Sequence, residues 1–119
     1  GHKVVRLNWS GKLIDLVEIV YGLYVGRCIN GGRCDIKEIV TAFEQLFGVR
    51  LSHIYNRLLA IRNRKNGRTP FLKWLSEQIE RDAYEKTNRY LVNKRQTTTE
   101  DRLSFQYIYF DNQGGHHPP

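Results

Sequence analysis

The chain has 119 residues, 40% of them hydrophobic and 12% aromatic, so it is large enough to bury a core, and we expect one folded domain. No apolar run reaches the roughly 20 residues that a membrane span needs, and we expect no membrane contact. Nineteen Lys and Arg against twelve Asp and Glu leave a formal charge of +7, which favours an anionic partner.

The positive charge is concentrated in one segment, residues 45–76, which we call the basic window. It contains no acidic residue, while the rest of the chain holds twelve residues of each sign, so the whole net charge lies here. A focused positive field attracts polyanions, because each neutralised phosphate releases a condensed counterion. A solvated charged helix is the alternative interpretation. The seven cations are Arg50, Arg57, Arg62, Arg64, Lys65, Arg68 and Lys73.

The first quarter of the chain predicts a short extended entry over residues 3–9, followed by a helix from Gly11 to Val25. Ser10 suits its N-cap, and Gly26 its end. A turn follows at residues 31–32. The helical spacing predicts a core stripe of Leu13, Leu16, Val17, Val20, Leu23 and Tyr24.

A second helix is predicted from Asp35 to Phe47. Asp35 and Glu38 suit a capping box, with Asp in place of Ser or Thr, and Gly48 stops the helix. The apolar residues of this helix are Ile36, Ile39, Val40, Phe43 and Phe47.

A third helix follows the link 49–51, with Ser52 as its N-cap. It begins at His53 and ends between Asn63 and Lys65, before the turn dipeptide 66–67. Its spacing places Ile54, Leu58 and Ile61 toward the core.

A fourth helix is predicted from Pro70 to Tyr90 or beyond, because Pro after Thr69 suits the first helical position. Its buried face is predicted to comprise Leu72, Leu75, Ile79 and Ala83. Residues 1–92 would then form the folded domain. Residues 93–119 would be a polar linker with a possible strand over 102–110 and a disordered tail from 113.

Two short helices joined by a Gly-containing turn are typical of a helix-turn-helix, and the second of them lies in the basic window. Its outward side carries the residue types that read base edges: Arg pairs with guanine, Asn with adenine, and a small Ala allows close approach to the groove. Ser52 and the helix N-terminus are expected near phosphates. The predicted outward residues are His53, Asn56, Arg57, Ala60, Asn63 and Arg64. Predicted backbone contacts come from Arg62, Lys65, Arg68 and Lys73, and Arg50 completes the predicted DNA-binding set.

The link between the two helices is longer than a helix-turn-helix usually has, which favours a winged variant. Ala42 is the candidate for the small packing residue of the first helix of the pair. A wing could come from residues 65–69 or from the possible strand at 102–110. Tyr55 is interpreted as a core or boundary aromatic.

No catalytic or metal-binding set emerges from the sequence. Cys28 and Cys34 are too far apart for a thiolate zinc pair, and no His has ligand spacing to them, so we expect reduced thiols and no metal. Asp15 and Glu18 are expected on a polar helix face. No Ser/His/Asp set, paired catalytic carboxylates or phosphate loop is present, so we expect neither an enzyme nor a cofactor.

Several stretches, in order, resemble the C-terminal region of the RteC family. They are LNWSGKLIDLVEIVYGL (7–23), INGG (29–32), DIKEI (35–39), FEQLFGVRL (43–51), Tyr55 and IRNRKNGRTPFL (61–72). The resemblance implies a cytoplasmic regulator of tetracycline-responsive excision genes on conjugative transposons. It also implies a winged-helix-like DNA-binding domain and an operator that is an inverted repeat. Carried over by position, it implies a basic segment of Arg62, Arg64, Lys65 and Arg68.

The sequence therefore predicts a mainly helical protein with a winged-helix-like helix-turn-helix domain, which binds double-stranded DNA as a transcription regulator. Two alternatives remain at this point. One is a protein-interaction module of a mobile element, whose basic face meets an acidic partner. The other is a nucleic-acid binder without sequence preference.

Overall fold

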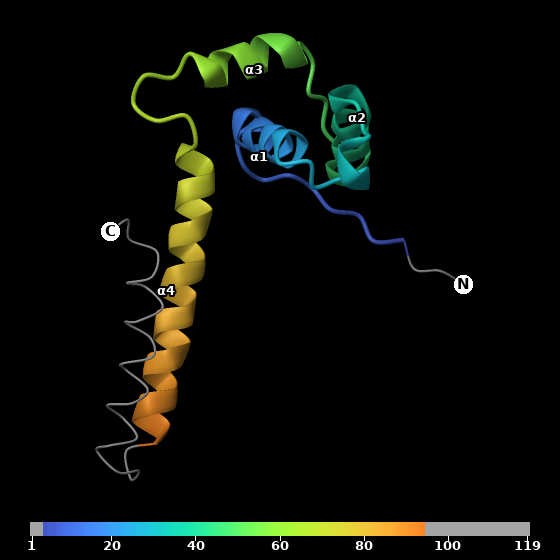
Figure 1. Cartoon of the computed structure of the whole chain (residues 1–119). Helices are drawn as coiled ribbons and strands as arrows, with labels where there is room; N and C mark the ends of the chain where they lie inside the picture. The colour runs from blue at the N-terminus through green and yellow to red at the C-terminus, as the bar shows by residue number, and fades with distance from the viewer. Residues whose placement is uncertain (1–3, 95–119) are drawn as a thin grey trace. The chain divides into compact units, whose positions relative to one another are not determined.

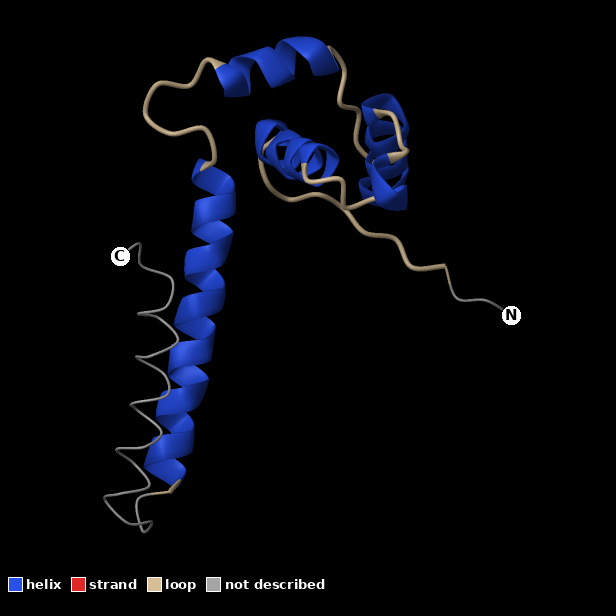
Figure 2. Ribbon diagram, in the orientation of Figure 1, coloured by secondary structure: helices blue, strands red, loops and turns tan. Residues whose placement is uncertain are grey.

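The computed structural model describes residues 4–94, all in helices and loops without a strand in that range (Figure 2). The helices are α1 (Leu13–Val25), α2 (Ile36–Phe47), α3 (Ile54–Arg62) and α4 (Pro70–Asn93), with a 3-10 turn, η1, at Asn30–Gly32. The chain forms two compact units, Gly1–Ser76 and Glu77–Pro119, whose boundary lies inside α4. The mainly helical fold is as predicted.

The core of the first unit is built around α1, which contacts both α2 and α3 (Figure 1). Leu16, Val17 and Val20 are completely buried on α1. The predicted inward stripes of the other two helices are confirmed, because their members are buried in the core or packed against it. The buried members of these stripes are Ile36, Ile39, Val40, Ile54, Leu58 and Ile61.

The start of α1 differs from the prediction. The N-cap position is Lys12, without a side-chain cap bond, rather than Ser10. Trp9 makes the contacts at the start of α1 instead. Its indole N–H donates to the Lys12 carbonyl at 2.9 Å, and its ring centroid lies 5.5 Å from that of Phe47. The entry segment is therefore anchored by Trp9.

The ends of α2 follow the prediction in position but not in all their bonds. Asp35 is the N-cap residue, yet its side chain makes no cap hydrogen bond, so the predicted capping box does not form. Gly48 ends the helix in the left-handed region, at φ 61°, where a Cβ would be strained.

The third helix begins one residue later than predicted. Its N-cap is His53, at φ 57°, and not Ser52. The reason is Leu51, two residues before His53. It is 2% exposed, and its burial in the core sets the backbone of the link that leads into α3. The start of α4 at Pro70 is confirmed, and it continues to Asn93.

Three predicted environments on the first two helices are wrong. Glu18 is buried, at 2% exposure, although the sequence placed it on a polar face. Tyr24 is exposed, as is Val25, because the last turn of α1 extends past the core. Ala42 lies on the open side of α2, so it cannot be the small packing residue.

On α4, Ile79 is 68% exposed and Ala83 is also exposed, so the predicted buried face does not continue past the first unit. Residues 65–69 form a loop without strand structure, so this alternative for a β-wing finds no support. The possible strand at 102–110 and the tail from 113 lie outside the described residues.

Candidate nucleic-acid interface

The link between α2 and α3 is held to α2 by one carboxylate. Glu44 accepts the Leu51 backbone N–H on Oε2 at 2.7 Å, and its own carbonyl accepts the Val49 N–H at 3.2 Å. Because Leu51 is also buried, the long link is fixed at its centre. The orientation of α3 relative to α2 therefore rests on defined contacts, in spite of the length of the link.

The outward side of α3 carries polar side chains and no acidic group. Asn56, Ala60 and Asn63 are exposed, while Arg57 is half-buried and its Nε donates to the Ser52 carbonyl at 2.7 Å. That bond places the Arg57 guanidinium at the N-terminal end of α3, beside the link. Of the predicted DNA-binding residues, those on the open surface are Arg50, Ser52, His53, Asn56, Ala60, Arg62, Asn63, Lys65, Arg68 and Lys73.

Two apolar residues of α3 also face solvent. Tyr55 is 57% exposed and Leu59 51% exposed, so of the two interpretations of Tyr55, core or boundary aromatic, the core position is wrong. The ammonium of Lys37, on α2, lies 5.5 Å from the Tyr55 ring centroid. The exposure of Tyr55 and Leu59 was not predicted from the sequence. Their i, i+4 spacing places both on one side of the helix, beside the inward stripe, and could have indicated it.

The arginines at the end of α3 are engaged with uncharged acceptors. The Arg62 Nε donates to the Tyr21 hydroxyl at 3.0 Å, and its guanidinium lies 5.3 Å from that ring centroid. The Arg68 Nε donates to the Arg62 carbonyl at 3.0 Å. Neutral acceptors leave the positive charge uncompensated, so these bonds orient the two guanidinium groups without cancelling their field.

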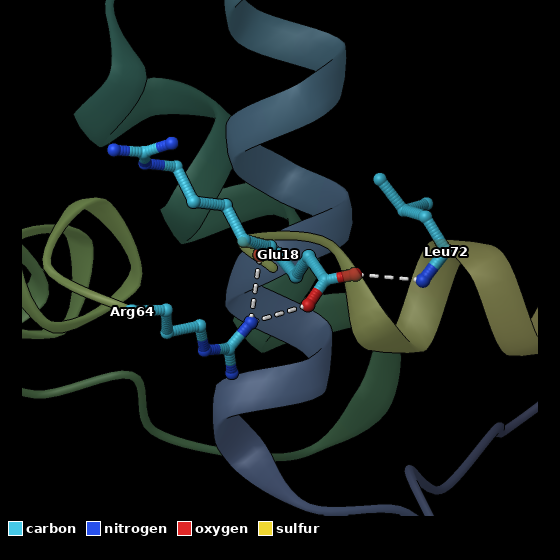
Figure 3. Close-up of polar contacts among 4 residues, drawn as sticks. Glu18, Arg64 and Leu72 are labelled. Carbon is cyan, nitrogen blue, oxygen red and sulfur yellow. Dashed lines mark hydrogen bonds and ion pairs between the residues drawn. The ribbon is translucent and has the colours of Figure 1, made fainter. Parts of the chain in front are cut away.

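Arg64 differs, because it pairs with a buried carboxylate (Figure 3). Its Nη1 lies 2.6 Å from Glu18 Oε1, and the two side chains are 22% and 1% exposed. Glu18 Oε2 accepts the Leu72 backbone N–H at 2.6 Å, and Arg64 Nη1 also donates to the Arg68 carbonyl at 2.9 Å.

This geometry departs from the expected placement of Arg64 on the outward face of the third helix. The helix ends at Arg62, and Arg64 turns back toward α1. The sequence signal for the pair was Glu18 itself, an acidic residue inside the apolar run 16–20.

The electrostatic balance of the basic window follows from these contacts. Within residues 4–94, the six window cations other than Arg64 form no ion pair. The positive charge of these six side chains is therefore not compensated by a carboxylate of residues 4–94 and is available to an anionic partner. A docked polyanion would meet six cations that need not first be released from internal carboxylates.

Within the described part of the chain, no helix combines the length and apolar character needed to cross a bilayer.

Cys28 is exposed and Cys34 half-buried, and both are free thiols. Burial raises the pKa of the Cys34 thiol, and the neighbouring Glu38 carboxylate, 3.8 Å from its Sγ, raises that pKa further. This thiol is thus poorly suited to act as a nucleophile.

The comparisons with known proteins concern the same part of the chain. A family model described as "RteC protein" matches residues 1–87, which include α1, α2, α3 and the whole basic window. Searches of curated proteins and of solved structures find no match. Because the family model covers nearly three quarters of the 119 residues, the chain belongs to the RteC family.

Proposed function

We propose that this protein is a transcription regulator that binds double-stranded DNA in a sequence-specific way. Membership of the RteC family is consistent with a protein related to excision of conjugative transposons. The observation that carries the proposal is the exposed side of α3, which combines Asn and Arg side chains with a surrounding window that lacks any acidic residue.

In this proposal α3 enters the major groove. Asn56, Arg57 and Asn63 contact base edges, and Ala60 allows close approach. Arg62, Lys65, Arg68 and Lys73 contact phosphates, which add affinity without reading sequence. The α2–link–α3 segment acts as the helix-turn-helix.

The biological setting belongs to the same proposal. The protein acts in the cytoplasm on a promoter-proximal operator, an inverted repeat, and controls tetracycline-responsive excision genes. It uses neither a cofactor nor a metal and catalyses no reaction. The inverted repeat would require two copies of α3 separated by about one helical turn of DNA or a multiple of it.

The test is selection from a pool of random-sequence duplexes at about physiological salt. Enrichment of one motif supports the proposal, and the spacing of its half-sites reports whether one or two copies bind. Retention without enrichment would instead indicate a binder without sequence preference. No retention would favour a module that binds an acidic protein partner.

A matched pair of variants distinguishes the effect of a charge in the basic window from the effect of the overall net charge. Lys86 lies outside the window and forms a surface ion pair with Asp82 at 3.1 Å. Lys86→Gln and Lys73→Gln remove the same charge, but only the second acts within the proposed interface. We expect Lys73→Gln to weaken binding and Lys86→Gln to leave the selected motif and its affinity unchanged.

A further inference from the structure

Three successive parts of the basic window are bonded to one helix, α1. The end of α3 is bonded through Arg62 to Tyr21, and the loop after it through Arg64 to Glu18. The first turn of α4 is bonded through the Leu72 N–H to the other oxygen of Glu18. The loop 63–69 is thus bonded to α1 through its second residue, Arg64, and the helices on either side of it are bonded to α1 through Arg62 and Leu72.

Two further bonds are made by arginines of the loop. Arg64 Nη1 donates to the Arg68 carbonyl, and Arg68 Nε donates to the Arg62 carbonyl. Together these two arginine-to-carbonyl bonds connect the start of the loop to its end. Lys65 and Gly67 take part in neither bond and are exposed.

The burial of Glu18 decides what this arrangement does. A carboxylate that is 1% exposed needs compensation, and here both oxygens are compensated by groups of the basic window. The contact at Glu18 Oε1 uses the charge of Arg64 inside the protein, so that charge is not available to a polyanion. In return, the contact between Glu18 and Arg64 fixes the conformation of the loop 63–69.

We propose that the Glu18–Arg64 pair is a positioning device that holds the loop 63–69 in the conformation that presents Lys65 and Arg68 to DNA phosphates. This inference rests on the proposed DNA-binding function and deepens it. Arg64 acts through the loop and does not itself contact DNA. Glu18, although acidic, then increases the affinity for an anionic partner.

The inference makes a prediction opposite in sign to simple electrostatics. Glu18→Gln removes one negative charge and frees Arg64, so charge alone predicts tighter binding to DNA. The positioning role predicts weaker binding, because a loose loop must be ordered when the complex forms. We expect a loss of about tenfold, the cost of ordering a few side chains and their backbone.

The experiment compares the wild-type protein with Glu18→Gln and with the control Glu38→Gln. Glu38 is exposed on α2, and its replacement removes the same charge without touching the loop. Affinity for the selected duplex and for random duplex is measured at a temperature at which circular dichroism shows each protein folded. A merely structural role of Glu18 would not change affinity under that condition.

The Glu18→Gln protein should stay folded, because the first turn of α4 has a second anchor. The Phe71 ring lies 5.9 Å from the Trp9 ring, which also packs against α2 through Phe47. A second variant, Arg64→Lys, covers the case of misfolding. It keeps the charge but lacks the planar fork that serves Glu18 and the Arg68 carbonyl together.

The outcomes are distinguishable. The proposal is supported if Glu18→Gln and Arg64→Lys weaken binding to specific and random duplex by the same factor, while Glu38→Gln does not. Hydrogen exchange without DNA should then be faster in residues 63–69 and at the Leu72 amide, with α2 unchanged. Equal or tighter binding by Glu18→Gln, or unchanged exchange in the loop, would overturn it. If the wild-type protein binds no duplex, the proposed function fails, whereas faster exchange still identifies the pair as the clamp of this loop.

Discussion

At the scale of single residues, the chemistry of α1 and the basic window depends on which charges are compensated inside the protein. Glu18 and Arg64 neutralise one another at 2.6 Å. The remaining window cations bond to carbonyl or hydroxyl oxygens or face solvent, and so keep their full charge. Of the seven cations of the basic window, one is therefore paired inside the protein, and six have no ion-pair partner among residues 4–94.

The stability of the Glu18–Arg64 pair can be tested by a double-mutant cycle. Arg64→Met leaves the Glu18 carboxylate buried and unpaired, and we expect it to lower the free energy of unfolding by about 3–5 kcal/mol. In Glu18→Leu with Arg64→Met the unpaired charge is gone, and the remaining loss of about 1–3 kcal/mol comes from the Leu72 N–H, which lacks an acceptor. Urea denaturation measures both values. Additive losses, with the double variant least stable, would contradict the pairing.

The base-reading and phosphate roles separate in a second pair of variants. Arg57→Ala should reduce discrimination between the selected motif and a single-base variant by about 1–3 kcal/mol, since the proposed bidentate contact to guanine is lost. Arg68→Ala should weaken binding evenly across sequences and reduce the salt slope by about one unit. Competition binding against a set of single-base variants measures both. Equal effects of Arg57→Ala on specific and random DNA would contradict its assignment to base reading.

The two cysteines are predicted to differ in reactivity. The raised pKa of Cys34 lowers its thiolate fraction at mildly alkaline pH, and the thiolate is the nucleophile. We expect iodoacetamide to modify the exposed Cys28 faster, as followed by mass spectrometry of the folded protein. Glu38→Gln should speed the reaction of Cys34, because it removes the nearby negative charge. Faster modification of Cys34 than of Cys28 in the unchanged protein would contradict this expectation.

At the scale of the elements, the two sides of α3 lie in different environments. Its inward side packs on α1 through Ile54, Leu58 and Ile61, while Tyr55 and Leu59 face solvent. Neighbouring residues in the sequence therefore stand in opposite environments. The proposed interface requires this orientation, because a rotated α3 would bury its Asn and Arg side chains.

Two adjacent leucines test that orientation. Leu58 is 2% exposed, and Leu58→Ala should lower the free energy of unfolding by about 2–5 kcal/mol through the cavity that it leaves. Leu59 is 51% exposed, and Leu59→Ala should change that free energy by less than about 0.5 kcal/mol. Thermal and urea unfolding of both variants measure the difference. Similar losses for the two would show that α3 is oriented otherwise.

Much of the secondary structure could be predicted from the sequence, and the failures have physical causes. Gly48 and Pro70 mark helix ends by backbone chemistry that any environment obeys. Ser10 and Ser52 were wrong as caps, because Trp9 and the buried Leu51 set the local backbone through tertiary packing. A cap preference contributes only about 1 kcal/mol, which such packing easily exceeds.

At the scale of the whole molecule, the net charge of +7 is carried by the basic window and predicts salt-sensitive binding. With Arg64 compensated by Glu18, at most six window cations can displace counterions from duplex DNA. The plot of log affinity against log salt should therefore have a slope no steeper than about −5. Titrations between about 50 and 200 mM salt measure it. A steeper slope would show that cations outside the window also meet DNA.

The candidate site divides in the same way between sequence and structure. The acid-free window, the inward stripe of α3 and the outward Asn56 and Ala60 follow from residue type and helical period alone, because both are local properties. Arg64 could not be placed by that reasoning. Its partner Glu18 is 46 residues away in the chain, and the pair forms only when α1 brings them together.

The sequence by itself determined the helices, their inward faces, the location of the charge and membership of the RteC family. These depend on composition, on the 3.6-residue period and on the order of motifs along the chain. Only the tertiary structure decided that Glu18 is buried, that Tyr55 and Leu59 are exposed, and that the loop 63–69 is bonded to α1. Burial and long-range ion pairs depend on which elements meet in space, and no local pattern encodes that.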